Sequence, residues 1–171
     1  MAKPKLAFIG MGIMGGPMTL NLLKAGYDVN VYTRTKSKAA SALDAGAVWK
    51  DSPAQAAKDV DIVITCVTDT PDVQKVLLGE NGVMDSAKDG MICVDNSTIS
   101  PAATIEMSQT LAQKGVTLID APISGGEIGA IQAKLPIMMG GPADAVEKVR
   151  PVMEAMGKNI IHCGPIGYGQ M

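Results

Sequence analysis

The feature that most constrains the fold is a short apolar run that ends in three spaced glycines. Leu6 to Ile9 form the run, Gly10-x-Gly12-x-x-Gly15 follows, and residues 17–25 have the composition of a helix. Between a strand and a helix, such glycines permit a tight turn, backbone approach to a pyrophosphate and close helix–strand packing. The helix N-terminus then offers free N–H groups and a positive dipole end to phosphates. The pattern predicts a dinucleotide-binding turn; a purely structural turn is the alternative.

The composition predicts one globular domain with an aliphatic core. The chain has 171 residues, of which 47% are hydrophobic and only 3% aromatic. That length allows a sizeable core, and with so few aromatic residues the core must consist of Val, Ile, Leu, Ala and Met. We therefore expect the twelve methionines to fill gaps in the core rather than to form a ligand site.

Charge and cysteine content disfavour several classes of partner. The net charge is −2 and no tract is rich in Lys or Arg, so no nucleic acid is expected. The apolar runs are too short to cross a membrane, and the first residues lack the pattern of a signal peptide. Cys66, Cys93 and Cys163 are widely spaced within apolar runs. This spacing predicts reduced, buried thiols in a cytoplasmic protein, with no disulfide and no metal site.

Strand and helix signals alternate along the chain, which predicts an α/β fold. We expect a Rossmann-type, doubly wound, mainly parallel sheet with helices on both faces. The expected strands are residues 6–9, 28–33, 47–49, 61–67, 91–95, 116–119, 135–139 and 159–162. The expected helices are residues 13–25, 36–45, 53–58, 71–78, 100–114 and 142–156, the last interrupted at Pro151. Residues 120–130 are expected to be irregular because they are rich in glycine.

The end of the second expected strand bears on the choice of dinucleotide. In NAD-binding folds of this type, an Asp or Glu at that point binds the ribose 2′-hydroxyl. Here the strand runs into Thr33-Arg34-Thr35, and Asp28 lies at its start instead. A guanidinium between two hydroxyls suits a 2′-phosphate. We therefore expect NADP, with NAD as the alternative; an ordinary turn with Thr35 as helix cap is compatible with either.

Three motifs together resemble one enzyme family. They are Gly-Met-Gly-Ile-Met-Gly-Gly-Pro-Met from Gly10, Asp95-Asn-Ser-Thr-Ile-Ser-Pro101 and Asp120-Ala-Pro-Ile-Ser-Gly-Gly126. In this order they are similar to the β-hydroxyacid dehydrogenases, which include 3-hydroxyisobutyrate dehydrogenase, tartronate semialdehyde reductase, glyoxylate/succinic semialdehyde reductases and, more distantly, 6-phosphogluconate dehydrogenase. The resemblance implies an oxidoreductase that transfers a hydride between NADP(H) and a small β-hydroxyacid or semialdehyde.

The resemblance also implies roles for individual residues. The cofactor would contact Gly10, Met11, Gly12, Ile13, Met14, Thr33, Arg34, Thr35, Val67, Thr68 and Thr98. The substrate carboxylate would be anchored by Ser124, Gly125 and Gly126, and a hydroxyl beside glycine N–H groups does form a compact anion cradle. A tight loop is the alternative for Ser124 to Gly126, and a helix cap is the alternative for Thr98.

The chain departs from the family pattern at several positions. Thr68 replaces the usual proline, and residues 133–136 replace the usual Gly-Thr-Leu, which affects the fine shape of the substrate site. Residues 164–171 resemble the family's Gly-x-Gly-x-x-x-Lys, which opens an interdomain helix. The catalytic lysine would fall two positions after Met171. We therefore expect a cofactor domain over residues 1–163, with the helical domain that makes the homo-oligomer absent and little activity in this chain alone.

Other titratable residues are expected to be structural. His162 ends an apolar strand, and Asp95 and Asp120 are expected to fix loops by accepting backbone hydrogen bonds. Two alternatives to the dehydrogenase remain at this point: a stand-alone dinucleotide-binding module, and a fragment of the 6-phosphogluconate type. The second is disfavoured because Lys134 is the only cation near the Ser124 loop in the sequence.

Overall fold

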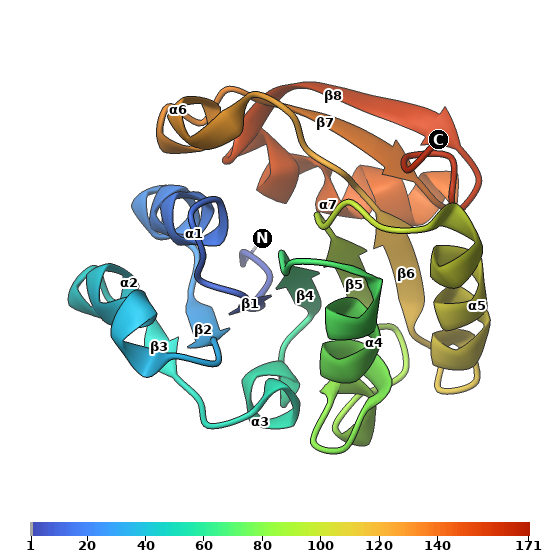
Figure 1. The fold of residues 1–171 in the computed structure, drawn as a ribbon, viewed down its shortest axis with the longest axis horizontal. Coiled ribbons are helices and arrows are strands. Elements are labelled where there is room, and N and C mark those ends of the chain that lie inside the picture. The colour runs from blue at the N-terminus through green and yellow to red at the C-terminus, as the bar shows by residue number, and fades with distance from the viewer. Residues whose placement is uncertain (1) are drawn as a thin grey trace.

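One eight-stranded sheet organises residues 2–171, the part of the chain that the computed structural model describes (Figure 1). Its order is β3-β2-β1-β4-β5-β6-β7-β8. The strands are β1 (Leu6–Ile9), β2 (Val29–Tyr32), β3 (Val48–Trp49), β4 (Ile62–Thr65), β5 (Ile92–Asp95), β6 (Thr117–Asp120), β7 (Leu135–Gly140) and β8 (Gly157–Gly164). Strands β1 to β6 are parallel, β7 is antiparallel to β6, and β8 is parallel to β7. The predicted Rossmann-type sheet is confirmed.

Helices cover both faces of the sheet, as a doubly wound fold requires. One face carries α1 (Gly15–Lys24), α2 (Ala40–Asp44) and α7 (Ala143–Glu154), and the other carries α3 (Pro53–Ala57), α4 (Thr70–Leu78) and α5 (Pro101–Ala112). Helix α6 (Gly126–Ile131) contacts α1, and two 3₁₀ turns, η1 (Lys36–Ala39) and η2 (Val83–Asp85), complete the connections. Within residues 2–171, none of the helices has the length and apolar character that crossing a bilayer requires.

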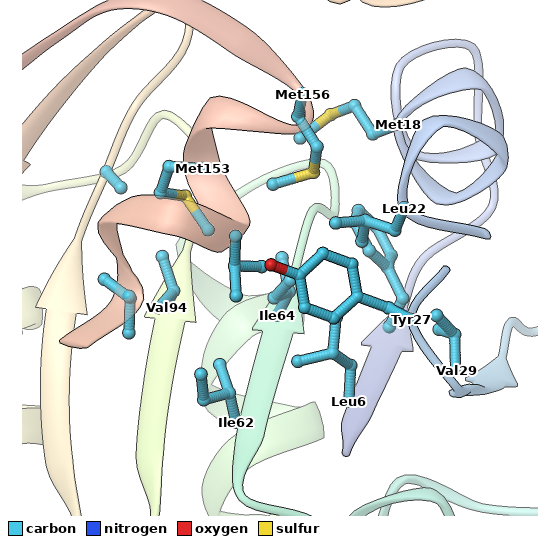
Figure 2. Close-up of a cluster of buried hydrophobic side chains, with 14 of the residues drawn as sticks. Leu6, Met18, Leu22, Tyr27, Val29, Ile62, Ile64, Val94, Met153 and Met156 are labelled. Atoms are coloured by element: carbon cyan, nitrogen blue, oxygen red, sulfur yellow. The ribbon is translucent and has the colours of Figure 1, made fainter. Parts of the chain in front are cut away.

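The strand β1 contributes to two separate cores because its side chains alternate between the faces of the sheet. Leu6 and Phe8 belong to the core under α1 and α7, whereas Ala7 and Ile9 belong to the core under α3, α4 and α5. Figure 2 shows the first core, in which three buried methionines pack above the strands: Met18, Met153 and Met156. The expected aliphatic, methionine-filled core is confirmed.

Three local expectations are wrong, each because tertiary packing outweighs the local signal. Residues 126–131 are helical rather than irregular, since Ala130 of α6 is buried in the core beside α1. Pro151 does not interrupt α7, because Val152 and Met153 after it are buried in the same core. Cys163 is exposed, since β8 is the edge strand of the sheet.

The segment after β8 forms turns over residues 166–170 rather than a regular helix. Asp120, at the end of β6, holds this segment through two backbone donors. Its Oδ1 accepts from Gly167 N at 2.8 Å and its Oδ2 accepts from Gln170 N at 2.9 Å. Asp120 thus has the loop-fixing role expected from sequence, whereas the start of an interdomain helix here stays a prediction.

Candidate cofactor site

The loops that carry the predicted site residues all leave one edge of the sheet. Strands β2, β1, β4, β5 and β6 are adjacent and parallel, so the segments after Tyr32, Ile9, Thr65, Asp95 and Asp120 emerge together. Ligands of open α/β sheets bind at this edge, where the order of connections reverses. Here the reversal lies between β1 and β4.

A cavity of about 600 Å³ lies at this reversal point. It is lined by every predicted cofactor residue except Thr98: Gly10, Met11, Gly12, Ile13, Met14, Thr33, Arg34, Thr35, Val67 and Thr68. Residues that the sequence did not indicate also line it, including Tyr32, Lys38, Asp51, Ser52, Asp72, Lys75, Glu80 and Asn81. Most of these belong to α3, α4 and the turns beside them, which reach the cavity only through the tertiary fold.

The three glycines of the turn occupy different surroundings. Gly10 has a φ of +105°, and a Cβ there would overlap the carbonyl oxygen of Cys66. A Cβ at Gly15 would overlap the carbonyl oxygen of Gly10. At Gly12, by contrast, a Cβ would meet no protein atom within 4 Å. The chain's own packing therefore explains Gly10 and Gly15, while the open space at Gly12 fits close approach of a pyrophosphate.

The N-terminus of α1, at Met14 and Gly15, lines the same cavity. Its N-cap is Met14, which provides no side-chain cap, and the first turn contains no acidic residue. The free N–H groups and the positive end of the helix dipole therefore lack a side-chain counterpart within the helix. This arrangement therefore favours a phosphate-binding turn over a purely structural one.

The far end of the cavity is polar and carries both signs of charge. The Arg34 side chain is 75% exposed, and its Nη1 lies 4.0 Å from Oδ1 of Asp72, whose side chain is 28% exposed. Thr35 is the N-cap residue of η1, yet its hydroxyl makes no capping hydrogen bond. The sequence-based alternative of a plain helix cap therefore does not account for Thr35.

The loop after β4, which bears Val67 and Thr68, is held by a buried hydrogen-bond network. Ser97 Oγ accepts from Val67 N at 2.9 Å. Asp95 Oδ1 in turn accepts from Ser97 N at 3.1 Å and from Thr65 Oγ1 at 2.8 Å. Burial raises the pKa of Asp95 to about 6, against the lowering effect of these hydrogen bonds. Asp95 therefore positions one wall of the cavity, as a loop-fixing acceptor.

The remaining predicted residues lie outside the cavity. Thr98 is exposed after β5, and the cap of α5 is Ser100, whose Oγ accepts from Ala103 N at 3.3 Å. Ser124, Gly125 and Gly126 are exposed after β6. Gly125 and Gly126 have φ values of 100° and 63°, which only glycine adopts readily. The helix-cap alternative thus fails for Thr98, and the Ser124 loop is a solvent-facing turn beside α6.

His162 lies outside the cavity, whereas Cys66 lines it as a buried thiol. His162 Nε2 lies 2.8 Å from the carbonyl oxygen of Gly141 and 3.0 Å from that of Gly164, which is a structural contact. Cys66 lines the cavity, but burial raises its pKa to about 12, so it is a neutral thiol rather than a nucleophile.

Comparison with known proteins agrees with this geometry. Residues 5–164 match the family described as the NAD binding domain of 6-phosphogluconate dehydrogenase. The 2-hydroxy-3-oxopropionate reductase of Escherichia coli is 43% identical over 166 residues, 97% of this chain and 56% of that protein. The chain thus spans a little over half the length of such relatives.

Solved structures extend the likeness to the fold. The 3-hydroxyisobutyrate dehydrogenase of Mycobacterium tuberculosis, solved with L-serine, is 34% identical and has a TM-score of 0.93; the match covers 99% of this chain and 57% of that one. An imine reductase of Myxococcus stipitatus in complex with NADP⁺ is 28% identical, with a TM-score of 0.90 and coverage of 98% and 57%. A variant of that reductase is in complex with NAD⁺, at 27% identity, a TM-score of 0.91 and coverage of 99% and 58%.

The glycine turn, the cavity at the sheet's reversal point and the match over residues 5–164 lead to one assignment. The predicted family resemblance is confirmed at the level of the cofactor domain, although the comparisons do not separate NAD from NADP. The chain belongs to the family of NAD(P)-binding domains of 6-phosphogluconate dehydrogenase and its hydroxyacid dehydrogenase relatives.

Proposed function

We propose that this chain is the cofactor-binding part of an enzyme that transfers a hydride between NADP(H) and a small β-hydroxyacid or semialdehyde. The observation that carries the proposal is the open space at Gly12, at the uncapped N-terminus of α1 and inside the cavity. Gly12 and the first turn of α1 bind the pyrophosphate, and the loop at Val67 and Thr68 forms the opposite wall. When bound, the nicotinamide supplies or accepts the hydride.

The preference for NADP rests on Arg34 at the end of β2. The Arg34 side chain is exposed at the cavity and no carboxylate closes the strand, so its guanidinium can contact a 2′-phosphate beside its ion pair with Asp72. We expect Arg34→Gln to weaken NADPH binding about tenfold and to leave NADH binding nearly unchanged, because a charge-assisted contact exists only with the phosphorylated cofactor. Isothermal titration of both cofactors measures this. Tighter binding of NADH than of NADPH by the unsubstituted chain would overturn the preference for NADP.

The substrate side of the proposal involves Ser124, Gly125 and Gly126. Their loop leaves β6 at the same edge of the sheet as the cofactor loops, and the left-handed glycines turn the backbone sharply there. In this proposal the hydroxyl and N–H groups hold the substrate carboxylate. Names of relatives such as 2-hydroxy-3-oxopropionate reductase support a small carboxylate substrate over a phosphorylated one.

The proton donor is not assigned to any residue of the described chain. The family resemblance implies that the donor is a lysine two positions after Met171, in an interdomain helix that would start near residues 164–171. We therefore propose that residues 1–163 are the dinucleotide domain and that oligomer formation and full activity depend on the helical domain that the family resemblance implies. A rate of semialdehyde reduction by these 171 residues that equals a full-length relative's would contradict this division of roles.

A further inference from the structure

The far end of the cavity contains a carboxylate, but it does not come from the end of β2, where NAD-binding folds usually have one. Asp72 lies in the first turn of α4, 40 residues after the end of β2, yet its side chain lies beside Arg34 in the lining of the cavity. Oδ1 of Asp72 is 4.0 Å from Nη1 of Arg34, and the Asp72 side chain is mostly shielded. Helix α4 thus brings a negative charge to the place where β2 lacks one.

The other charged side chains that line the cavity are differently placed. Asp51 Oδ1 accepts a hydrogen bond from the indole Nε1 of Trp49 at 2.8 Å. Glu80 is exposed, and Lys38 and Lys75 are cations. Among residues 2–171, Asp72 is the carboxylate that forms an ion pair with Arg34. Its negative charge therefore acts directly on the guanidinium proposed to bind a 2′-phosphate.

The two dinucleotides would respond to Asp72 in opposite ways. A 2′-phosphate drawn to Arg34 comes close to the carboxylate, and like charges at such a distance repel. A ribose that carries a 2′-hydroxyl has no such charge and can donate a hydrogen bond to the same carboxylate. Asp72 also lowers the positive potential of Arg34 by pairing with it.

We propose that Asp72 sets the cofactor specificity of this site by opposing the phosphate preference of Arg34, so that the domain accepts both NADH and NADPH. This inference rests on the proposed function, since it presumes that a dinucleotide fills the cavity. In this proposal a residue of α4, and not only the end of β2, determines how well the site distinguishes NADPH from NADH.

The test compares Asp72→Asn with the unsubstituted chain by titrating NADPH and NADH separately at low salt. We expect the dissociation constant for NADPH to fall about fivefold, and that for NADH to change less than about threefold. The NADPH gain should shrink at high ionic strength, because the groups are partly exposed. Asp44→Asn is the matched control, since Asp44 is exposed at the end of α2 and does not line the cavity.

A structural role for Asp72 gives a different result. Asp72 is in the first turn of α4, where its charge favours the helix, and its N–H donates to Asp69 Oδ1 at 3.3 Å. The substitution keeps the backbone N–H but removes the charge. If that charge served only to stabilise the helix, Asp72→Asn would weaken the binding of both cofactors alike, which would overturn the proposal, as would an unchanged ratio of the two dissociation constants. Asp72→Gln, which also removes the charge but places a good helix former at this position inside α4, repeats the test if the Asn variant folds poorly. If the unsubstituted chain binds neither cofactor, the proposed function itself fails.

Discussion

Alanine at Gly12 is expected to weaken NADPH binding about 100-fold, a loss of about 2.7 kcal/mol, while the domain stays folded. A Cβ at this position meets no protein atom within 4 Å, so the folded chain accommodates it. The same Cβ occupies the space through which the backbone approaches the pyrophosphate. The charge-assisted hydrogen bonds to the phosphates are then lost or lengthened.

Alanine variants at two neighbouring glycines serve as controls that distinguish an effect on cofactor binding from an effect on folding. Gly16 also has open space around its Cβ position, but it does not line the cavity. Gly16→Ala should keep cofactor affinity and stabilise α1, by about 0.5–1 kcal/mol. Gly15→Ala should instead destabilise the fold by about 3 kcal/mol or more, because its Cβ would overlap the Gly10 carbonyl oxygen. Equal NADPH affinities for the Gly12 and Gly16 variants would show that the pyrophosphate does not lie at Gly12.

The glycine turn and the sheet could be predicted from sequence because their signals are local. Apolar runs such as Ile62–Thr65 are buried on both faces, and serine before proline marks helix starts at Ser52 and Ser100. Helix α6 could not be predicted in this way, since Gly125 provides no side-chain cap and packing on α1 stabilises it. Helical continuity through Pro151 likewise depends on the buried residues that follow it.

The residues of the candidate site also fall into two groups: those that local sequence spacing locates and those that only the tertiary fold brings to the cavity. Gly10 to Met14 and Thr33 to Thr35 are contiguous with the strand ends, so spacing alone locates them. Asp72 reaches the cavity only because β4 lies beside β1 and α4 follows β4. Ser97 lies within the motif from Asp95 to Pro101, but that motif does not reveal that Ser97 connects Asp95 to the cavity wall at Val67. Sequence spacing cannot place such residues, because their roles depend on which strands become neighbours.

Folding stability is expected to fall by about 2 kcal/mol between pH 4 and pH 7 through Asp95 alone. Burial raises the pKa of this carboxyl from 3.8 to about 6. Between these values the folded chain holds a proton that the unfolded chain has released, so raising the pH favours unfolding. The contribution is complete below pH 4 and is lost as the pH rises through about 6.

The surroundings of Asp95 support this direction. Its Oδ2 has no hydrogen-bond partner among the described residues, so the ionised form is poorly compensated. Asp120 is its register neighbour on β6, and the pKa of Asp120 is itself raised by burial. The Cys66 and Cys93 thiols nearby stay neutral, since burial raises the pKa of each to about 12. Asp120 therefore adds to the same trend, and the thiols do not oppose it.

Asp95→Asn isolates the effect, because an amide oxygen can still accept from Thr65 and Ser97 but the group no longer titrates. Urea unfolding at several pH values gives the free energy of unfolding of both proteins. The free energy of unfolding of the unsubstituted chain, minus that of the variant, should decline by about 2 kcal/mol from pH 4 to pH 7. Asp44→Asn, at an exposed position, should show no comparable trend. A difference that stays constant across this range would mean that folding does not raise the pKa of Asp95.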